Sequence, residues 1–389
     1  MHDYQTVNLP IFGDFGTKFK QLLLGGVRFF DLFCGGGGVS VAFKMATGQE
    51  VTAAVNHNQP SINMHEVNHP ETKHYKEDIK ESDPIIVTEG RYVDGLWLSP
   101  DCTYFSLARG GVPVRKNERG LAWMAVKWVG KIFKHNPDNI PKVIYLENVP
   151  EFADWSRVVA KRNKALPGNP VIRVDGTFAA KGAVTPINQQ MMVPDRSKKH
   201  KGRSFRNWCK TLGKYGYKIE FRRSVVACNY GDGTSRKRLL VIARCDGQPI
   251  VWPEPTHGAP ESDDVKAGNL QPWPIAADII DWNNLGNSIF LTTDEAKEVR
   301  RNGGPNIKRP LADNTVRRCI VGLHKFVALN PKPFIKKLEV SVVAPVISTI
   351  DQQSNKSGVS KSTEPLSTIT RKARHMLVSP VLAKHYGGG

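Results

Sequence analysis

Long apolar runs and a leader sequence are both missing from the 389-residue chain. Apolar residues make up 40% of it, yet no stretch reaches the roughly 18 consecutive apolar positions that a membrane-spanning helix needs. The N-terminal stretch MHDYQTVNLPIFGDFGTKFK shows no charged segment followed by an apolar one, so no secretory signal is predicted. We therefore expect a cytoplasmic protein with enough apolar residues for a sizeable core.

Closely spaced cysteines are missing as well. The six cysteines show no C-x-x-C spacing, which argues against a zinc site or a disulfide framework and suits a reducing cytoplasm. They are Cys34, Cys102, Cys209, Cys228, Cys245 and Cys319. Four histidines, at positions 57, 65, 69 and 74, lie near one another in sequence. No cysteine or carboxylate spacing supports a metal ion there, so none is predicted.

Acidic residues are scarce relative to basic ones. The chain has 36 Asp and Glu against 55 Lys and Arg, which gives a net charge of +19. Such a balance favours a polyanionic partner, most simply nucleic acid. The run RSKKHKGRSFR at 196–206 is one dense basic segment and strengthens this interpretation.

Apolar runs alternate with helical patterns from residue 27 onward. Strands are predicted at 27–33, 50–56, 95–100, 142–149, 218–231 and 236–244, and helices at 39–46, 60–69, 120–134 and 204–217. Near-continuous apolar strands that alternate with helices indicate a parallel sheet with helices on both faces. The predicted fold class is therefore α/β.

Three segments organise the chain. Residues 1–26 precede the first predicted strand and are interpreted as an N-terminal extension. Residues 27–257 hold the alternating elements, with a polar stretch at 154–203 that is predicted to be an insertion or basic loop. After WPEPTH at 252–257 the periodicity weakens, so 258–389 is predicted to be a smaller, β-rich and irregular region.

Chemically useful side chains follow several of the predicted strands. DLFCGGGG at 31–38 joins a strand to a helix, where glycines let the backbone turn tightly and approach a nucleotide-like cofactor. SPDCTYFS at 99–106 places Cys102 in a polar turn after an apolar run. Glu147 ends another apolar run, and Arg236 and Arg238 share one face of a later strand. Carboxyl ends of strands are where open α/β sheets hold their active sites.

These motifs, taken together, resemble those of the cytosine-5 DNA methyltransferase family. DLFCGGGG resembles the cofactor loop, SPDCTYFS the nucleophile loop, ENV at 147–149 the Glu-Asn-Val motif, and TSRKR at 234–238 the Gln-x-Arg-x-Arg motif. The resemblance extends to WPEPTH and to PLADNTVRRCIVGL at 310–323, so it covers roughly residues 27–330 in the order of the family. Several motifs in one order are far more specific than any one of them.

The resemblance implies a Rossmann-like sheet that binds S-adenosylmethionine, followed by a target-recognition region at 258–389. It implies that Cys102 adds to C6 of a cytosine flipped out of double-stranded DNA, and that Glu147 acts at N3. Arg236 or Arg238 would steady O2, and Asn148 would brace the cysteine loop. The cofactor contacts implied are Phe33, Gly35, Gly36, Gly38, Asn56, His57, Asp78, Ile79 and Pro100. A cytoplasm of a prokaryote or a phage-infected cell is the expected location.

The chain departs from the family pattern at four places. Asp101, rather than proline, precedes the cysteine, Asn56 stands where a ribose-binding glutamate is usual, and Thr234 replaces the glutamine of the arginine motif. No Asn-containing closing motif is found before the last residues. The region 258–389 is therefore expected to be truncated, and a second polypeptide is one possible source of the missing motif. The alternatives are a catalytically impaired DNA-binding remnant, one part of a split methyltransferase, and the same chemistry on RNA.

Overall fold

A computed structural model describes residues 26–105, 119–180, 183–282, 287–337, 342–349, 359–367 and 375–378. Internal contacts divide the chain into two compact units. Unit 1 consists of Met1–Ser224 and Arg238–Trp252, and unit 2 of Val225–Lys237 and Pro253–Gly389. No helix among the described residues is long and apolar enough to cross a membrane.

The centre of unit 1 is a seven-stranded sheet with the order β3-β2-β1-β4-β5-β9-β8. Its strands are β1 (Phe29–Leu32), β2 (Ala53–Val55), β3 (Lys73–Tyr75), β4 (Gly95–Leu98), β5 (Val143–Asn148), β8 (Lys218–Val226) and β9 (Lys237–Arg244). Strands β1 to β5 pair in parallel, whereas β9 runs antiparallel to β5. This is the α/β, Rossmann-like sheet that the sequence predicts.

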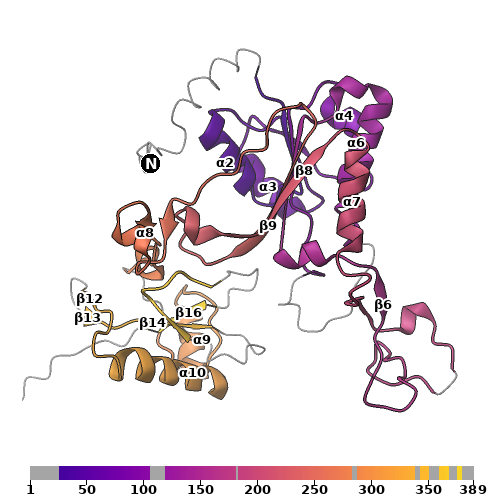
Figure 1. The fold of residues 1–389 in the computed structure, drawn as a ribbon. Helices are drawn as coiled ribbons and strands as arrows, with labels where there is room; N and C mark the ends of the chain where they lie inside the picture. Colours follow the sequence, from indigo (N-terminus) through magenta and orange to yellow (C-terminus); the bar gives the residue numbers. More distant parts are fainter. Residues whose placement is uncertain are drawn as a thin grey trace, which may run out of the picture. The chain divides into compact units, whose positions relative to one another are not determined.

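Helices cover both faces of this sheet, as Figure 1 shows. On one face lie α2 (Gly38–Thr47) and α3 (Gln59–Asn68), which link the first parallel strands. On the other lie α4 (Pro84–Thr88), α6 (Trp123–His135) and α7 (Arg203–Gly213), with α6 in contact with both its neighbours. The alternation of strands and helices along the chain places the turns that leave β1, β2, β4 and β5 at one edge.

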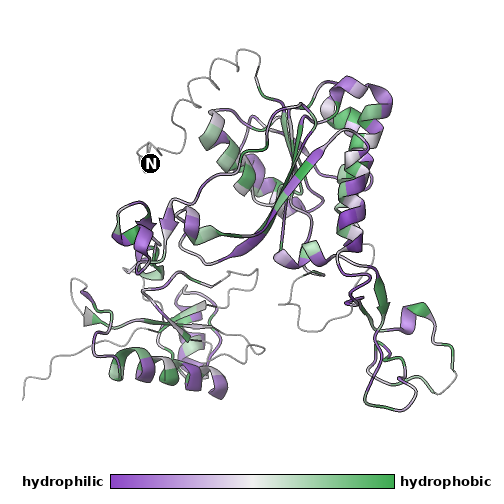
Figure 2. Ribbon diagram, in the orientation of Figure 1, coloured by the Kyte–Doolittle hydropathy of each residue, from purple (hydrophilic) through white to green (hydrophobic). Residues whose placement is uncertain are grey.

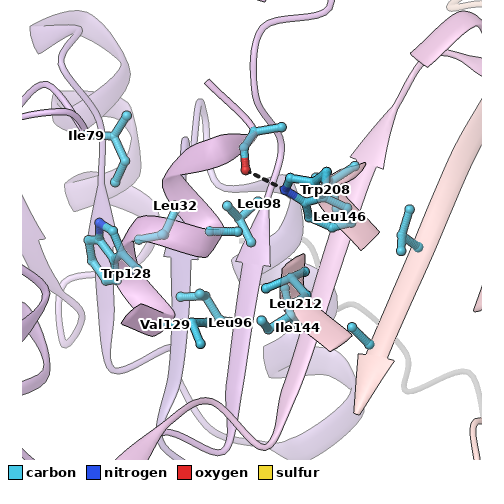
Figure 3. Packing of buried hydrophobic residues seen from close by; sticks show 14 of the residues in the cluster. Leu32, Ile79, Leu96, Leu98, Trp128, Val129, Ile144, Leu146, Trp208 and Leu212 are labelled. Carbon is cyan, nitrogen blue, oxygen red and sulfur yellow. Dashed lines mark hydrogen bonds between the residues drawn. The ribbon is translucent and has the colours of Figure 1, made fainter. Parts of the chain in front are cut away.

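The main core fills the space between the sheet and α6 and α7. Alternate strand residues such as Leu32, Leu98 and Leu146 meet Trp128 and Trp208 there, and all of these side chains are buried (Figure 3). The indole of Trp208 also donates a hydrogen bond to the Ala122 carbonyl at 2.9 Å. Figure 2 shows both helices with hydrophobic and hydrophilic sides, which explains why their periodicity is visible in the sequence.

Residues 154–203 contain more regular structure than the predicted polar loop. Short helical turns η4 (Pro150–Asp154) and η5 (Ile187–Gln189) flank an antiparallel pair formed by β6 (Val158–Ala160) and β7 (Met192–Pro194). Isolated bridges join further residues between these two strands, such as Arg162 with Val171. Strands of three residues are too short to give a periodic signal in the sequence.

Unit 2 combines short helices with small sheets. Its helices and turns are η6 (Ala227–Tyr230), α8 (Asp263–Lys266), η7 (Ala276–Asp278), α9 (Thr293–Arg301), α10 (Asp313–Leu323) and η8 (His324–Ala328). Its strands are β10 (His257–Gly258), β11 (Gln271–Pro272), β12 (Lys336–Lys337), β13 (Val342–Val343), β14 (Val346–Thr349), β15 (Val359–Lys361) and β16 (His375–Val378). Strands β15, β14 and β16 form an antiparallel sheet that packs against α10.

Candidate active site

The loops that leave the parallel strands of unit 1 are joined by backbone hydrogen bonds. The Phe33 and Cys34 amides, after β1, donate to the Val55 carbonyl at the end of β2, at 3.0 and 3.3 Å. The Ser99 amide, after β4, donates to the Leu32 carbonyl at 3.3 Å. The predicted cofactor loop and the predicted nucleophile loop are therefore neighbours at one edge of the sheet.

The glycine loop between β1 and α2 is closed on one side and open on the other. Gly37 has φ +92°, and a Cβ there would lie 3.0 Å from His69 and 3.2 Å from His65. A Cβ on Gly36 would lie 2.3 Å from Met64 Cε. By contrast, a Cβ on Gly38 would meet no atom within 4 Å. This open side leaves room for a ligand to approach the backbone, as a nucleotide-like cofactor requires.

A buried polar network supports the glycine loop from below. Ser40 Oγ lies 3.2 Å from Asp31 Oδ2 and 2.9 Å from His65 Nε2, and His65 Nδ1 lies 2.8 Å from His74 Nε2. Burial raises the pKa of Asp31 to about 7, and burial together with neighbouring His69 and His74 lowers the pKa of His65 to about 4. Ser40 donates its hydroxyl proton to Asp31, so neutral His65 is the donor to the Ser40 oxygen and its tautomer fits one hydrogen-bond chain.

These histidines are engaged in hydrogen bonds with protein groups. His69 Nδ1 lies 2.7 Å from Glu50 Oε2, which completes the support of the glycine loop from α3. Among the described residues, no group of three or more His, Cys, Asp or Glu is arranged to hold a metal ion.

The ends of β2 and β3 place the other predicted cofactor residues beside the glycine loop. Asn56 donates its amide to the Tyr75 carbonyl at 3.1 Å, and its side-chain oxygen accepts from the Asn58 amide at 2.9 Å. His57 is exposed, whereas Ile79 is buried. The Asp78 side chain is 45% exposed, and one carboxylate oxygen accepts from the Lys80 amide at 3.0 Å. These residues offer an apolar wall and an accessible carboxylate that can accept a hydrogen bond, which fits an adenosyl group.

Cys102 lies in the loop that follows β4, half-buried. Its carbonyl accepts from the Phe105 amide at 2.9 Å, which closes a turn around it. The Asp101 carboxylate accepts from the amide and the hydroxyl of Thr103, at 2.7 and 2.6 Å. The carboxylate in the position of the family's proline is thus bound within its own turn.

Asn148 and Glu147, the last residues of β5, reach two different neighbours. The Asn148 amide donates to the Pro100 carbonyl at 3.0 Å, so a buried side chain holds the backbone two residues before Cys102. Glu147 forms an ion pair with Arg238 of β9, and both side chains are partly exposed. Antiparallel pairing of β5 with β9 produces this meeting, because Asn148 lies opposite Leu239.

Arg236 belongs to unit 2 and is described there. Its amide donates to Thr234 Oγ1 at 3.3 Å, and its carbonyl accepts from the Ala227 amide at 2.9 Å. The Thr234 hydroxyl in turn donates to the Leu366 carbonyl at 2.9 Å. Arg238 lies in unit 1 and forms the ion pair with Glu147.

Two supports of the site were missed by sequence reasoning. Phe105, three residues after Cys102, is buried against Phe152 and Trp155, with ring centroids 4.9 and 5.9 Å away, and so anchors the loop. Ser40 links Asp31 to His65 beneath the glycine loop. The clustering of aromatic residues near the motifs was the only signal of the anchor, and nothing in the sequence indicated the Ser40 link.

Comparison with known proteins bears directly on this edge of the sheet. Residues 27–163 match the model of the family described as C-5 cytosine-specific DNA methylase. This match confirms the predicted family resemblance and, with it, S-adenosylmethionine as the cofactor of the domain.

Curated relatives of the methylase domain are distant in sequence. The chain is 23% identical over 261 residues to the type II methyltransferase M.AquIA of Picosynechococcus sp. The aligned region covers 65% of this chain and 87% of that protein. It is 23% identical over 236 residues to M.AgeI of Thalassovita gelatinovora, covering 59% of this chain but only 42% of that protein. Among solved structures, Dnmt2 methyltransferase of S. pombe is 14% identical with a TM-score of 0.40, covering 71% and 66% of the two chains.

Proposed function

We propose that this protein transfers a methyl group from S-adenosylmethionine to C5 of cytosine in double-stranded DNA through a covalent adduct with Cys102. The observation that carries the proposal is the meeting of the glycine loop, the Cys102 turn and the Glu147–Arg238 pair at one edge of the sheet. The methylase-domain match supplies the reaction class.

Cys102 is the residue suited to form the new bond. C5 of cytosine is a weak nucleophile, and addition of the thiolate sulfur at C6 pushes the ring electrons to C5. After methyl transfer, loss of the C5 proton expels the thiolate and restores the ring. Asn148 holds the Pro100 carbonyl and thereby fixes the direction in which the loop presents the thiol.

Glu147 and Arg238 are placed to stabilise the ring while the thiol is attached. Addition at C6 places negative charge on N3 and O2, and a carboxyl group that bonds N3 lowers the energy of that charge. The guanidinium of Arg238, already paired with Glu147, orients the carboxyl and can bond O2 through its other N–H groups. The cytosine must leave the base stack to reach these side chains, so base flipping belongs to the proposal.

S-adenosylmethionine supplies an electrophilic methyl group when it is bound. Phe33 and the backbone of Gly35, Gly36 and Gly38 would line its site, with Pro100 at the boundary to the cysteine loop. Asp78 would accept from the adenine amino group and Ile79 would pack against the ring. His57 and Asn56 would lie near the ribose.

Covalent trapping tests the proposal. Duplex DNA with 5-fluorocytosine, incubated with the protein and S-adenosylmethionine, should give a complex stable to denaturation, because fluorine cannot leave as the proton does. Cys102→Ser should abolish both trapping and methyl transfer, while S-adenosylmethionine still binds. Cys245→Ser is a matched control, since that thiol lies at the opposite edge of the sheet, 3.3 Å from the Pro141 carbonyl. Methylation by Cys102→Ser at a comparable rate would refute the covalent mechanism.

A second candidate is a chain that needs a second polypeptide to bind cofactor well. Asn56 favours it, because an amide replaces the usual carboxylate and its oxygen already accepts from Asn58. Each lost hydrogen bond to a ribose hydroxyl costs about 1–3 kcal/mol, or roughly ten- to hundredfold in affinity. Calorimetry decides between the two, because micromolar binding of S-adenosylmethionine to this chain alone would exclude a required partner. Millimolar binding together with DNA binding would favour the impaired or split form.

A further inference from the structure

More than half of the net positive charge is concentrated in one stretch of unit 1. Residues 157–206 contain twelve Lys and Arg and two Asp, a net charge of +10 out of +19 for the whole chain. This stretch lies outside the motifs of the methylase family quoted above. Repulsion between so many like charges destabilises the folded state, and a bound polyanion removes that repulsion.

The final part of this stretch, residues 195–206, is folded into consecutive turns. Asp195 Oδ1 accepts from the Ser197 amide at 3.0 Å, and the Ser197 carbonyl accepts from the His200 and Lys201 amides at 3.0 and 2.9 Å. The Ser204 amide then donates to the Trp155 carbonyl at 3.0 Å, which ties the turns to the loop after β5. The basic side chains thus project from an ordered backbone, which lowers the entropy lost on binding.

Nearby carboxylates neutralise only part of this charge. Asp154 lies 2.6 Å from Arg223 and 3.5 Å from Lys201, and Asp195 lies 3.0 Å from Arg157. Five further cations are exposed and have no ion pair within the part of the chain that the structure describes. They are Arg196, Lys198, Lys199, Arg203 and Arg206.

One of these cations, Arg196, lies beside the nucleophile loop. A cavity of about 400 Å³ is bounded by Tyr104 and Phe105, two and three residues after Cys102, and by Arg196 and Lys201. Glu151, Asp154 and Asp195 also line it, so its rim is mixed in charge. Through Lys201 it adjoins a second hollow of about 660 Å³ lined by Lys198 and Arg206. Positive charge therefore extends from the nucleophile loop along α7.

We propose that residues 195–206 bind the phosphate backbone of the DNA strand that carries the target cytosine. The inference rests on the proposed function, because a cytosine that reaches Cys102 brings its own flanking phosphates to that loop. Phosphates are neutralised by Lys and Arg side chains without regard to base sequence. The surface thus supplies affinity and strand position, while base reading belongs elsewhere.

The salt dependence of DNA binding tests the inference. The triple variant Lys198→Gln, Lys199→Gln, Arg206→Gln should bind duplex DNA at least tenfold more weakly near 0.1 M salt. Its slope of log affinity against log salt should be smaller by about 2–3, since each phosphate contact contributes roughly 0.9. The affinity for S-adenosylmethionine and the rate at saturating DNA should stay within about twofold of the parent.

A matched control is available at the far edge of the same sheet. Lys134, Lys214 and Lys218 are exposed and lie at the ends of α6 and α7 and the start of β8. Their replacement by glutamine removes the same charge and should leave the salt slope nearly unchanged. Equal losses in the two triple variants would mean that only net charge matters, and would overturn the inference. An unchanged slope in the first triple variant would do the same.

Two further measurements keep the outcome clear. If the triple variant melts earlier than the control, the pair Lys198→Glu, Lys199→Glu replaces it, because both residues lie in exposed turns. A loss of binding to single-stranded RNA without a loss for duplex DNA would also refute the inference. If the parent binds DNA with the steep slope yet never methylates, the proposed function fails while the phosphate site stands.

Discussion

At the scale of the residue, Asp31 lies in an environment that changes its ordinary acid–base chemistry. Its side chain is fully buried on β1, and burial raises its pKa to about 7, although a hydrogen bond from Ser40 favours the charged form. A carboxyl group of this kind binds a proton in the native state over the range in which the unfolded chain has lost it. Its contribution to stability is therefore present at low pH and is lost as pH rises toward 7.

Asp31→Asn should remove this pH dependence. His65 has its pKa lowered to about 4 and contributes the opposite slope, so the variant must be compared with the parent at each pH. Between pH 6 and 8 the difference in free energy of unfolding should move by about 1 kcal/mol in favour of the variant. Urea unfolding at both pH values measures it. A difference independent of pH would show that Asp31 is ionised throughout.

The ion pair of Glu147 and Arg238 allows a prediction about the rate of methyl transfer. Glu147→Gln should lower the rate of methyl transfer by about 10²–10⁴, the usual range for a lost general acid, while DNA still binds. Because Arg238 is paired with Glu147, adding Arg238→Gln should cost less than its single effect. Single-turnover rates of the parent, the two single variants and the double variant measure the coupling between the two residues.

Arg244→Gln provides the control for that cycle. Arg244 lies on the same strand and is also ion-paired, 2.6 Å from Asp246, but at the other end of β9. Its replacement should leave the rate of methyl transfer within about threefold. A Glu147→Gln protein that keeps its rate but loses DNA binding would indicate a structural carboxylate.

At the scale of the element, two neighbouring glycines in the loop between β1 and α2 should respond differently to replacement by alanine. Gly37→Ala places a Cβ at φ +92° against buried His65 and His69, so it should destabilise the protein by about 1–3 kcal/mol. Gly38→Ala meets no atom within 4 Å and begins α2, so its stability should be equal or slightly higher.

Thermal melting measures the stability of the two glycine variants, and calorimetry measures their affinity for S-adenosylmethionine. If the open side of the loop faces S-adenosylmethionine, Gly38→Ala should weaken cofactor binding without lowering the melting temperature. Equal melting temperatures for the two variants would mean that the loop adapts to a left-handed alanine. Unchanged cofactor affinity in Gly38→Ala would move the binding surface away from that glycine.

Elements with a strong hydrophobic pattern could be predicted from the sequence, whereas short elements could not. Strands β1, β4, β5 and β9 and helices α6 and α7 fall within the predicted ranges to a few residues, because buried strands read as apolar runs and amphipathic helices keep their period. Strands β6 and β7 have only three residues each and were not predicted.

The predicted site shows the same division. Motifs singled out the glycine loop, Cys102, Glu147 and Asn148 because each follows or ends an apolar strand, and their roles stay predictions. The ion pair of Arg238 with Glu147 depends on the register of β5 with β9, which a single sequence does not contain. The link of Ser40 to both Asp31 and His65 needs the packing of α2 against α3 and β1.

At the scale of the whole molecule, the buried clusters that the described residues form in the two units differ in size. In unit 1, buried side chains from β1, β4, β5, β9, α6 and α7 join one cluster that includes Trp128 and Trp208. In unit 2, the cluster formed by the described residues is built on Cys319, Val346 and Val378. Burial of apolar area is the main stabilising term, so a smaller cluster leaves less free energy to oppose local opening.

Hydrogen exchange of the full chain should therefore separate the two units. Amides of β1, β4 and β5 should exchange at least tenfold more slowly than those of β14 and β16, which corresponds to about 1.4 kcal/mol or more between the two opening reactions. Mass spectrometry of peptides from both units at one pH provides the comparison, with exposed α9 as a fast reference inside unit 2. If the amides of all these strands exchange at one rate, the chain opens only as a whole. The two units would then not differ in their free energies of local opening.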